Sequence, residues 1–351
     1  MKKSFVIKIV VSILFFTLPL SVSADTVIPE SELVCVHTIE EPITNATVDL
    51  LRADFNASRE MFLEDVSALC LNSPGGSLEA GIEIARFVNR EIIRTVIKSD
   101  ATCLSACAIA FFGGTGGIGM WTYPSRTLYP GGDLGLHAPD INLAPGTYTS
   151  GEVRSAYAVA LETVSAVLDF GHTRYSTGSE TIMNDFLIRN FVTTTPVGDN
   201  FWRPRTVEDA IKADIDLGVT GLPVAPATYI NICDNFVSRY GWDGVSPYPT
   251  QQIISERVAN DFTIRDIVTD ELYAWVGGYW RGGRNVMVCR VSLEPTTTYA
   301  ASPSFLVSLI EHQWGAVYPL QEGQEYTTEF FRSAAPVAYT YTYDTEISEI
   351  P

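Results

Sequence analysis

Positive charge is scarce in this sequence. Its 351 residues include 23 lysines and arginines against 41 aspartates and glutamates, which gives a formal net charge of −18. Such an acidic surface repels phosphate groups, so the composition argues against nucleic acids and anionic membranes as partners. The hydrophobic content of 46% and the charged content of 18% are ordinary for a globular protein. A chain of this length has room for two domains.

Patterns that bind metal ions are missing as well. The sequence has neither a CxxC pattern nor a histidine pair spaced as HxxxH, so a zinc site is disfavoured, and we expect no metal ion and no cofactor. The six cysteines are Cys35, Cys70, Cys103, Cys107, Cys233 and Cys289. They permit about fifteen disulfide pairings, and sequence does not choose among them. Cys233 and Cys289 are natural partners because both lie in the second half. A Cys103–Cys107 bridge is geometrically tight if both residues lie on one regular helix.

Long apolar segments are absent beyond the N-terminus, where no stretch offers about 18 uninterrupted apolar residues. The N-terminus itself begins with lysines, continues with an apolar run over residues 9–20 and ends in small residues at 22–24. This order predicts a secretory signal peptide over residues 1–24, with an uncleaved N-terminal anchor as the alternative. Export would place the cysteines in an oxidising compartment, where disulfides persist.

Strand and helix patterns alternate in the first third of the chain. Residues 31–48, 66–72 and 92–98 are rich in apolar and β-branched residues, which predicts strands. Apolar residues at helical spacing predict a helix over about 78–90, and residues 106–112 read as a buried helix. This alternation is typical of an α/β fold in which helices cover a parallel sheet.

The next hundred residues change character. Residues 113–133 are rich in glycine, proline and aromatics, which predicts a long surface excursion. Helices are expected over about 151–170 and 180–190, and a further helix starts at Thr206.

A domain boundary is expected in the proline- and glycine-containing segment 219–228. The first domain then spans residues 25–222. Residues 229–351 read as a smaller α+β domain of unknown role, with strands and one helical stretch around 303–312. The sequence contains no internal repeat.

Three short segments carry residue types that acyl-transfer enzymes use. Residues 71–81 (LNSPGGSLEAG) run from a strand through a glycine pair into a helix, and such a turn directs backbone N–H groups outward. Ser105 begins the buried helix, and His137 ends a short apolar step. Each segment alone also fits a plain role: a strand-to-helix turn, a helix cap and a structural histidine.

Together the three segments resemble the proteolytic subunit of the Clp protease family, within the wider Clp/crotonase fold. Ser73-Pro74-Gly75-Gly76 matches that family's oxyanion-hole turn, and the segments around Ser105 and His137 follow in the family's order. The resemblance covers about residues 30–222. It implies that Ser105 is the nucleophile and His137 its base, and that the N–H groups of Gly76 and Ala106 bind the oxyanion. The cysteines beside Ser105 depart from the cytoplasmic enzymes and suggest an exported branch.

The third member of the implied triad is less defined. The resemblance places an aspartate ahead of the helix that starts at Thr206, and Asp199 fits that place with a small insertion. Asp185 and Asp169 remain candidates, and Asp199 fits a loop-turn role nearly as well.

The combined interpretation is an exported serine peptidase. Its lysine-rich start and its resemblance to the Clp protease family suggest a bacterial periplasm. We expect peptides or unfolded protein as substrate, no AAA+ ATPase partner, no nucleic acid, and a homo-oligomer as one option. The main alternative is a non-enzymatic periplasmic binding or scaffold protein that kept the fold. Acyl-CoA chemistry ranks last, because CoA is cytoplasmic and its phosphates would meet an acidic protein.

Overall fold

The structure of the chain is a computed structural model. It describes residues 30–31, 33–62, 67–118, 121–139, 146–176, 181–195, 199–218, 226–240, 267–269, 273–280, 285–292, 305–313, 328–335, 341–342 and 344–350. The predicted signal peptide lies outside these residues. Among the described residues, no helix is both long and apolar enough to cross a membrane.

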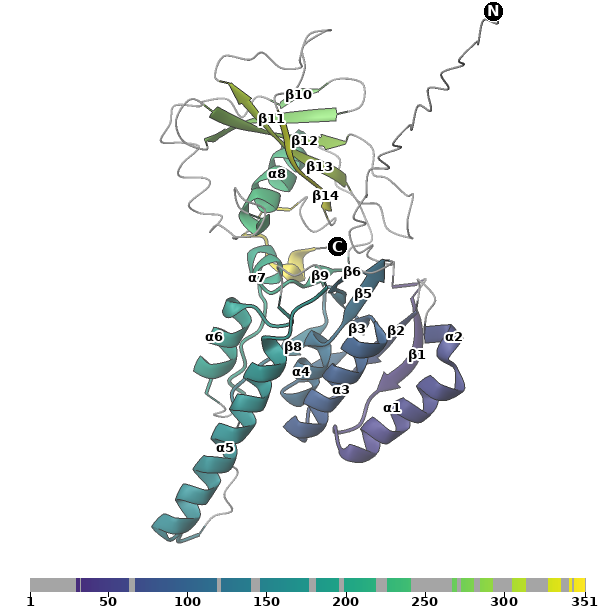
Figure 1. The fold of residues 1–351 in the computed structure, drawn as a ribbon, viewed down its shortest axis with the longest axis vertical. Helices are drawn as coiled ribbons and strands as arrows, with labels where there is room; N and C mark the ends of the chain where they lie inside the picture. The colour runs from purple at the N-terminus through teal and green to yellow at the C-terminus, as the bar shows by residue number, and fades with distance from the viewer. Residues whose placement is uncertain are drawn as a thin grey trace, which may run out of the picture.

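A five-stranded sheet forms the centre of the N-terminal part of the chain (Figure 1). Its strands, in spatial order, are β1 (Val34–Ile39), β2 (Ser67–Leu71), β3 (Thr95–Ile97), β7 (Arg126–Leu128) and β9 (Asp216–Leu217). Every neighbouring pair is parallel. The central strands β2, β3 and β7 are buried along their whole length, as expected when both faces of a parallel sheet are covered. The predicted α/β class with a parallel sheet is therefore confirmed.

Helices form the crossovers between these strands, as right-handed parallel connections require. The first ones are α1 (Asn45–Ala57), α2 (Arg59–Phe62), α3 (Leu78–Glu91) and α4 (Ala106–Phe112). The Ser77 side chain caps α3 by accepting a hydrogen bond from the N–H of Ala80. A Cβ atom on Gly81 would lie 2.5 Å from the carbonyl oxygen of Ala106, so α3 and the start of α4 are in close contact.

Helix α1 corrects the prediction of one strand over residues 31–48. The strand ends at Ile39, and Thr44 and Thr47 form a capping box that starts the helix. Val48, Leu51 and Phe55 then bury one helical face. The β-branched residues of this segment masked the change of period, because Ile and Thr favour strands whether or not a cap follows them.

Residues 113–133 are not a surface excursion, and that prediction was wrong. They contain the hairpin β5 (Thr115–Ile118) and β6 (Trp121–Pro124), then β7, and β8 (Asp133–Gly135) begins at their end. β7 lies inside the central sheet although it carries Arg126. Nε and Nη1 of the buried arginine donate hydrogen bonds to the carbonyl oxygens of Phe112, Ile182 and Asp214, and Nη2 lies 3.7 Å from the Asp214 carboxylate.

Replacing Arg126 by alanine is expected to lower the free energy of unfolding by about 3–5 kcal/mol. The Arg126 side chain is 0% exposed and lies 3.7 Å from the Asp214 carboxylate, which is 5% exposed. Its removal would leave a buried charge and three carbonyls without their donor. Arg52→Ala is the matched control, because its pair with Glu83 is about 40% exposed and should contribute under about 1 kcal/mol. Urea denaturation of both variants measures the difference, and equal losses would contradict the assignment.

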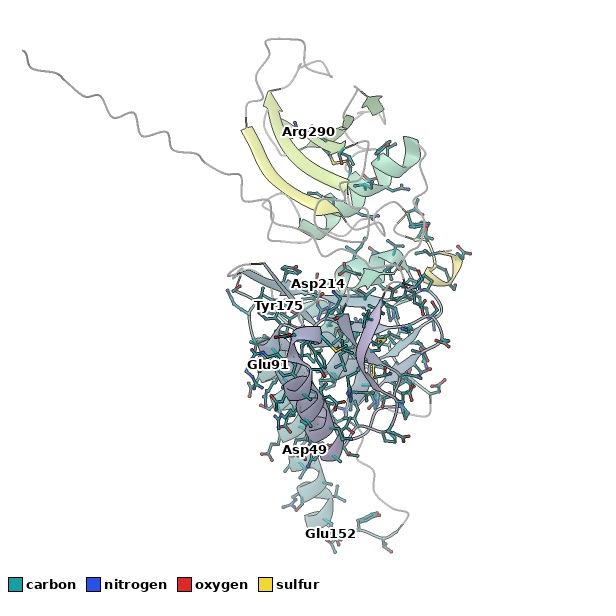
Figure 2. All side chains as sticks on the ribbon, turned by 90° about the vertical axis from the view of Figure 1, so that its right-hand side faces the viewer. Asp49, Glu91, Glu152, Tyr175, Asp214 and Arg290 are labelled. Atoms are coloured by element: carbon teal, nitrogen blue, oxygen red, sulfur yellow. A yellow bond between two sulfur atoms is a disulfide. The ribbon has the colours of Figure 1, made fainter. Side chains whose placement is uncertain are left out.

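The C-terminal half of the parallel-sheet region is helical. Its helices are α5 (Ser150–Gly171), α6 (Asp185–Thr193) and α7 (Val207–Lys212). Thr206 caps α7, the helix predicted to start there, and Thr149 caps α5. The N-terminal half of α5 stands clear of the other helices, with Glu152 at its tip (Figures 1 and 2).

A second sheet is antiparallel and belongs to the C-terminal part of the chain. Its strands are β10 (Ile267–Thr269), β11 (Tyr273–Trp280), β12 (Asn285–Ser292), β13 (Phe305–Gln313) and β14 (Thr328–Ala335), preceded by helix α8 (Pro226–Tyr240). A disulfide joins Cys233 of α8 to Cys289 of β12, which confirms that predicted pairing. The helix expected around 303–312 is wrong, because β13 pairs with strands on both sides.

Candidate active site

Ser105 lies at a sharp turn between the short strand β4 (Thr102–Leu104) and α4. Its backbone adopts φ 57° and ψ −119°, a conformation that costs a residue with a Cβ atom about 1–3 kcal/mol. Such strain persists only where the surroundings fix it, and it clusters at functional sites. The side chain is half-buried at the N-terminal end of a fully buried helix. A strained strand-to-helix turn of this kind presents a nucleophilic hydroxyl to a substrate.

Backbone hydrogen bonds hold this turn from two sides. The N–H of Leu104 donates to the carbonyl of Ser73 over 3.1 Å, and the N–H of Ser105 donates to the carbonyl of Gly135 over 2.8 Å. The first bond ties Ser105 to the glycine turn and the second ties it to the strand that leads to His137. The fold thus brings the three predicted segments together, although more than sixty residues separate the first from the last.

The glycine turn touches the serine directly. Gly75 has φ 101° and Gly76 has φ 145°, a region that residues with a Cβ atom rarely adopt. A Cβ on Gly75 would lie 2.6 Å from the Leu104 oxygen and 2.8 Å from the Ser105 Cβ. A Cβ on Gly76 would lie 2.4 Å from the Ile43 oxygen. Only glycine fits at both positions, because each contact is closer than van der Waals distance.

Two backbone N–H groups in this turn have no acceptor within the described part of the chain. Ile43 bonds to the carbonyl of Gly75 and to the N–H of Ser77, so Gly76 uses neither of its own polar groups there. Ala106 is the first residue of α4, where an N–H has no acceptor inside the helix. Gly76 and Ala106 are the two donors predicted for an oxyanion hole; Gly76 is exposed, whereas Ala106 is fully buried.

His137 comes two residues after β8, which pairs in parallel with β4. Leu104 lies opposite Gly135 in that pair, so Ser105 and His137 follow the same end of two neighbouring strands. Beyond this point the chain bonds to another segment, since Leu136 and Trp202 exchange backbone hydrogen bonds of 3.0 and 2.8 Å. The register therefore brings the backbones of the candidate base and the candidate nucleophile to the same end of this strand pair.

The His137 imidazole is half-buried and packs edge-on against the Phe201 ring, with ring centroids 4.8 Å apart. Its Nδ1 atom is buried and has no hydrogen-bond partner in the ranges described. The same ranges contain no hydrogen bond between His137 and Ser105. Catalytic hydrogen bonds in unliganded sites are often long and tighten when substrate binds. No local sequence pattern predicts the contact between His137 and Phe201, because Phe201 belongs to a segment more than sixty residues away.

Asp199 lies at the edge of this site, without contact to the imidazole. Its side chain is 84% exposed, and its carboxylate lies 3.4 Å from the Arg203 guanidinium. Arg203 also pairs with Asp133 of β8 at 2.7 Å, and that hydrogen bond raises the pKa of the guanidinium. Asp185 and Asp169 are exposed on α6 and α5, and neither bonds to His137 in the described ranges. The structure thus gives none of the three candidate acids a bond to the base.

Asp199→Asn is therefore expected to lower kcat/KM by less than about tenfold, whereas loss of a working triad aspartate costs about 10⁴-fold. An exposed carboxylate already paired with Arg203 contributes little to orienting a half-buried imidazole. Steady-state kinetics of the variant beside Asp185→Asn measures this. A loss of about 10³-fold confined to Asp199→Asn would show that the aspartate reaches His137 during turnover.

Three disulfides join the six cysteines: Cys35–Cys70, Cys103–Cys107 and Cys233–Cys289. They indicate an oxidising, extracytoplasmic environment. The Cys103–Cys107 bond is possible because Cys103 lies in β4 and Cys107 in α4, so the bridge spans a turn and not one regular helix. Within the described ranges, no cluster of side chains is arranged to hold a metal ion.

Comparisons with known proteins assign no family to the chain. No protein-family model matches it, and no curated protein matches it. Among solved structures it is similar to a mutant of the membrane-bound stomatin-specific protease 1510-N, with 16% identity and a TM-score of 0.32. The alignment covers 52% of this chain and 77% of that chain. A likeness at this level identifies neither family nor activity, so function rests on the geometry of the site.

Proposed function

We propose that this chain is an exported serine peptidase of the ClpP-like type, acting in the bacterial periplasm through Ser105 and His137. The observation that carries the proposal is the strained backbone of Ser105 at the N-terminal end of α4, beside the N–H groups of Gly76 and Ala106, which have no acceptor in the described part of the chain. The parallel pairing of β4 with β8 supports His137 as the base, because it brings the imidazole to the same strand ends.

The proposed reaction follows from these positions. His137 takes the proton of the Ser105 hydroxyl as its Oγ attacks a peptide carbonyl, and the N–H groups of Gly76 and Ala106 bind the resulting oxyanion. The protonated imidazole then gives its proton to the leaving amine, and water hydrolyses the acyl-enzyme. Asp199 is a proposed partner of His137 only after a movement of the segment that carries it toward the imidazole.

The proposed substrates are peptides or loosely folded protein segments. ATP-driven unfolding does not operate outside the cytoplasm, so the enzyme would work without an AAA+ partner on chains that are already unfolded. The disulfides support this location, since they persist only in an oxidising compartment.

The test is covalent labelling of the full chain, purified with its disulfides intact, by a fluorophosphonate probe. We expect mass spectrometry to find one adduct, on the peptide that contains Ser105, and the protein to cleave reduced, carboxymethylated protein substrates. A chain that neither labels nor cleaves at any pH or assembly state would instead be the binding protein that retained this fold.

A further inference from the structure

The Cys103–Cys107 disulfide encloses the proposed catalytic turn. Cys103 is the middle residue of β4, and Cys107 is the second residue of α4. The three residues between them include the strained Ser105 and the oxyanion donor Ala106. Both cysteines are 0% exposed, and their Cα atoms lie 5.1 Å apart.

The entropy of the unfolded chain indicates that this disulfide acts on its immediate surroundings. A disulfide restrains the unfolded state by an amount that grows with the logarithm of the loop length, so shorter loops gain less stability. The Cys103–Cys107 bond spans 4 residues, whereas the other two span 35 and 56. Among the three bonds, it is therefore the one least suited to stabilising the whole fold.

The turn also lacks an equally firm link on its helical side. On the strand side, the N–H groups of Leu104 and Ser105 donate to neighbouring strands over 3.1 and 2.8 Å. On the helix side, the carbonyl of Ser105 accepts from Ile109 over 3.3 Å. The disulfide joins the two sides covalently, across Ser105 and its positive φ of 57°.

We propose that Cys103 and Cys107 are positioning residues of the active site, whose disulfide holds Ser105 and the Ala106 N–H in their reactive arrangement. This inference rests on the proposed peptidase function. The inference goes beyond that function by assigning the disulfide a role in kcat and not in substrate binding. A misplacement of about 1 Å can lower a reaction rate about 100-fold.

The experiment compares the full-length double variants Cys103→Ala/Cys107→Ala and Cys35→Ala/Cys70→Ala. Cys35–Cys70 is the matched control because it joins the neighbouring strands β1 and β2 of the central sheet. It packs in a cluster that does not include Ser105, with Leu33, Ala68, Val96 and Tyr129. We expect loss of the Cys103–Cys107 bond to lower kcat and the fluorophosphonate labelling rate at least ~100-fold, with KM within about threefold. The control should label within about threefold of the wild type and lose more thermal stability.

Normal kcat and labelling in a folded Cys103→Ala/Cys107→Ala variant would overturn the proposal. If that variant does not fold, Cys103→Val/Cys107→Ala fills more of the buried volume and answers the same question. If the wild type itself never labels, the peptidase function fails, and hydrogen exchange still tests the positioning role. The Ser105 and Ile109 amides should then exchange faster only in the Cys103–Cys107 variant, and unchanged exchange would overturn it.

Discussion

Ser105→Ala is expected to abolish fluorophosphonate labelling and to lower kcat/KM by about 10⁴-fold or more, since removing a nucleophile disables the catalytic unit as a whole. Stability should change by no more than about 0.5 kcal/mol. The hydroxyl is half-buried and makes no hydrogen bond within the described residues, and alanine experiences the same backbone strain as serine. The combination of a large kinetic loss with an unchanged fold distinguishes a nucleophile from a helix cap.

The controls for this variant come from the same chain. Ser155→Ala changes an exposed serine on α5 and should leave both labelling and stability unchanged. His137→Ala should lower the labelling rate by at least ~100-fold, as expected for the loss of a general base. Labelling that persists in Ser105→Ala, on the same peptide or on another, would remove Ser105 from the mechanism.

Local signals explain which elements sequence predicts correctly. Helix α7 begins directly after Thr206, whose side chain accepts a hydrogen bond from the N–H of Asp209, and two acids occupy the first turn. Helix α4 follows from an uninterrupted apolar run, and α3 from apolar residues on one face after Ser77. Each of these elements depends on residues within about four positions along the chain, so local sequence patterns predict it.

Two of the errors fall where distant contacts decide the structure. Arg126 enters the central strand β7 only because carbonyls from three other segments accept its hydrogen bonds. β13 has a mixed apolar and polar pattern, and its strand form comes from pairing with β12 and β14. Composition alone favours a loop in the first case and a helix in the second.

The site divides in the same way. The glycine turn, Ser105 and His137 follow from a motif order, and the strand register brings them together. The Phe201 ring against His137 and the Arg203 pair with Asp133 depend on how a distant loop returns to β8. No spacing rule in the sequence contains that return, so the sequence indicates Asp199 by its place in the chain and not by its surroundings.

Gly75→Ala is expected to have the second largest effect, because it strikes both the fold and the site. The new Cβ would lie 2.6 Å from the Leu104 oxygen and 2.8 Å from the Ser105 Cβ, at a φ of 101° that alanine rarely adopts. Backbone strain should cost about 1–3 kcal/mol of stability, and overpacking about as much again. Any relief of the contact moves Ser105, so kcat should fall by at least ~100-fold even in molecules that remain folded.

Gly151→Ala is the matched control for that variant. Gly151 lies in the first turn of α5, where the nearest atom to a new Cβ is 3.8 Å away, and alanine favours the helix by up to about 1 kcal/mol. Thermal denaturation and the labelling rate should be unchanged or slightly improved in Gly151→Ala and reduced together in Gly75→Ala. If Gly75→Ala kept the wild-type labelling rate, contact between the glycine turn and Ser105 would not control the nucleophile, and the oxyanion hole assigned to Gly76 would lose its structural basis.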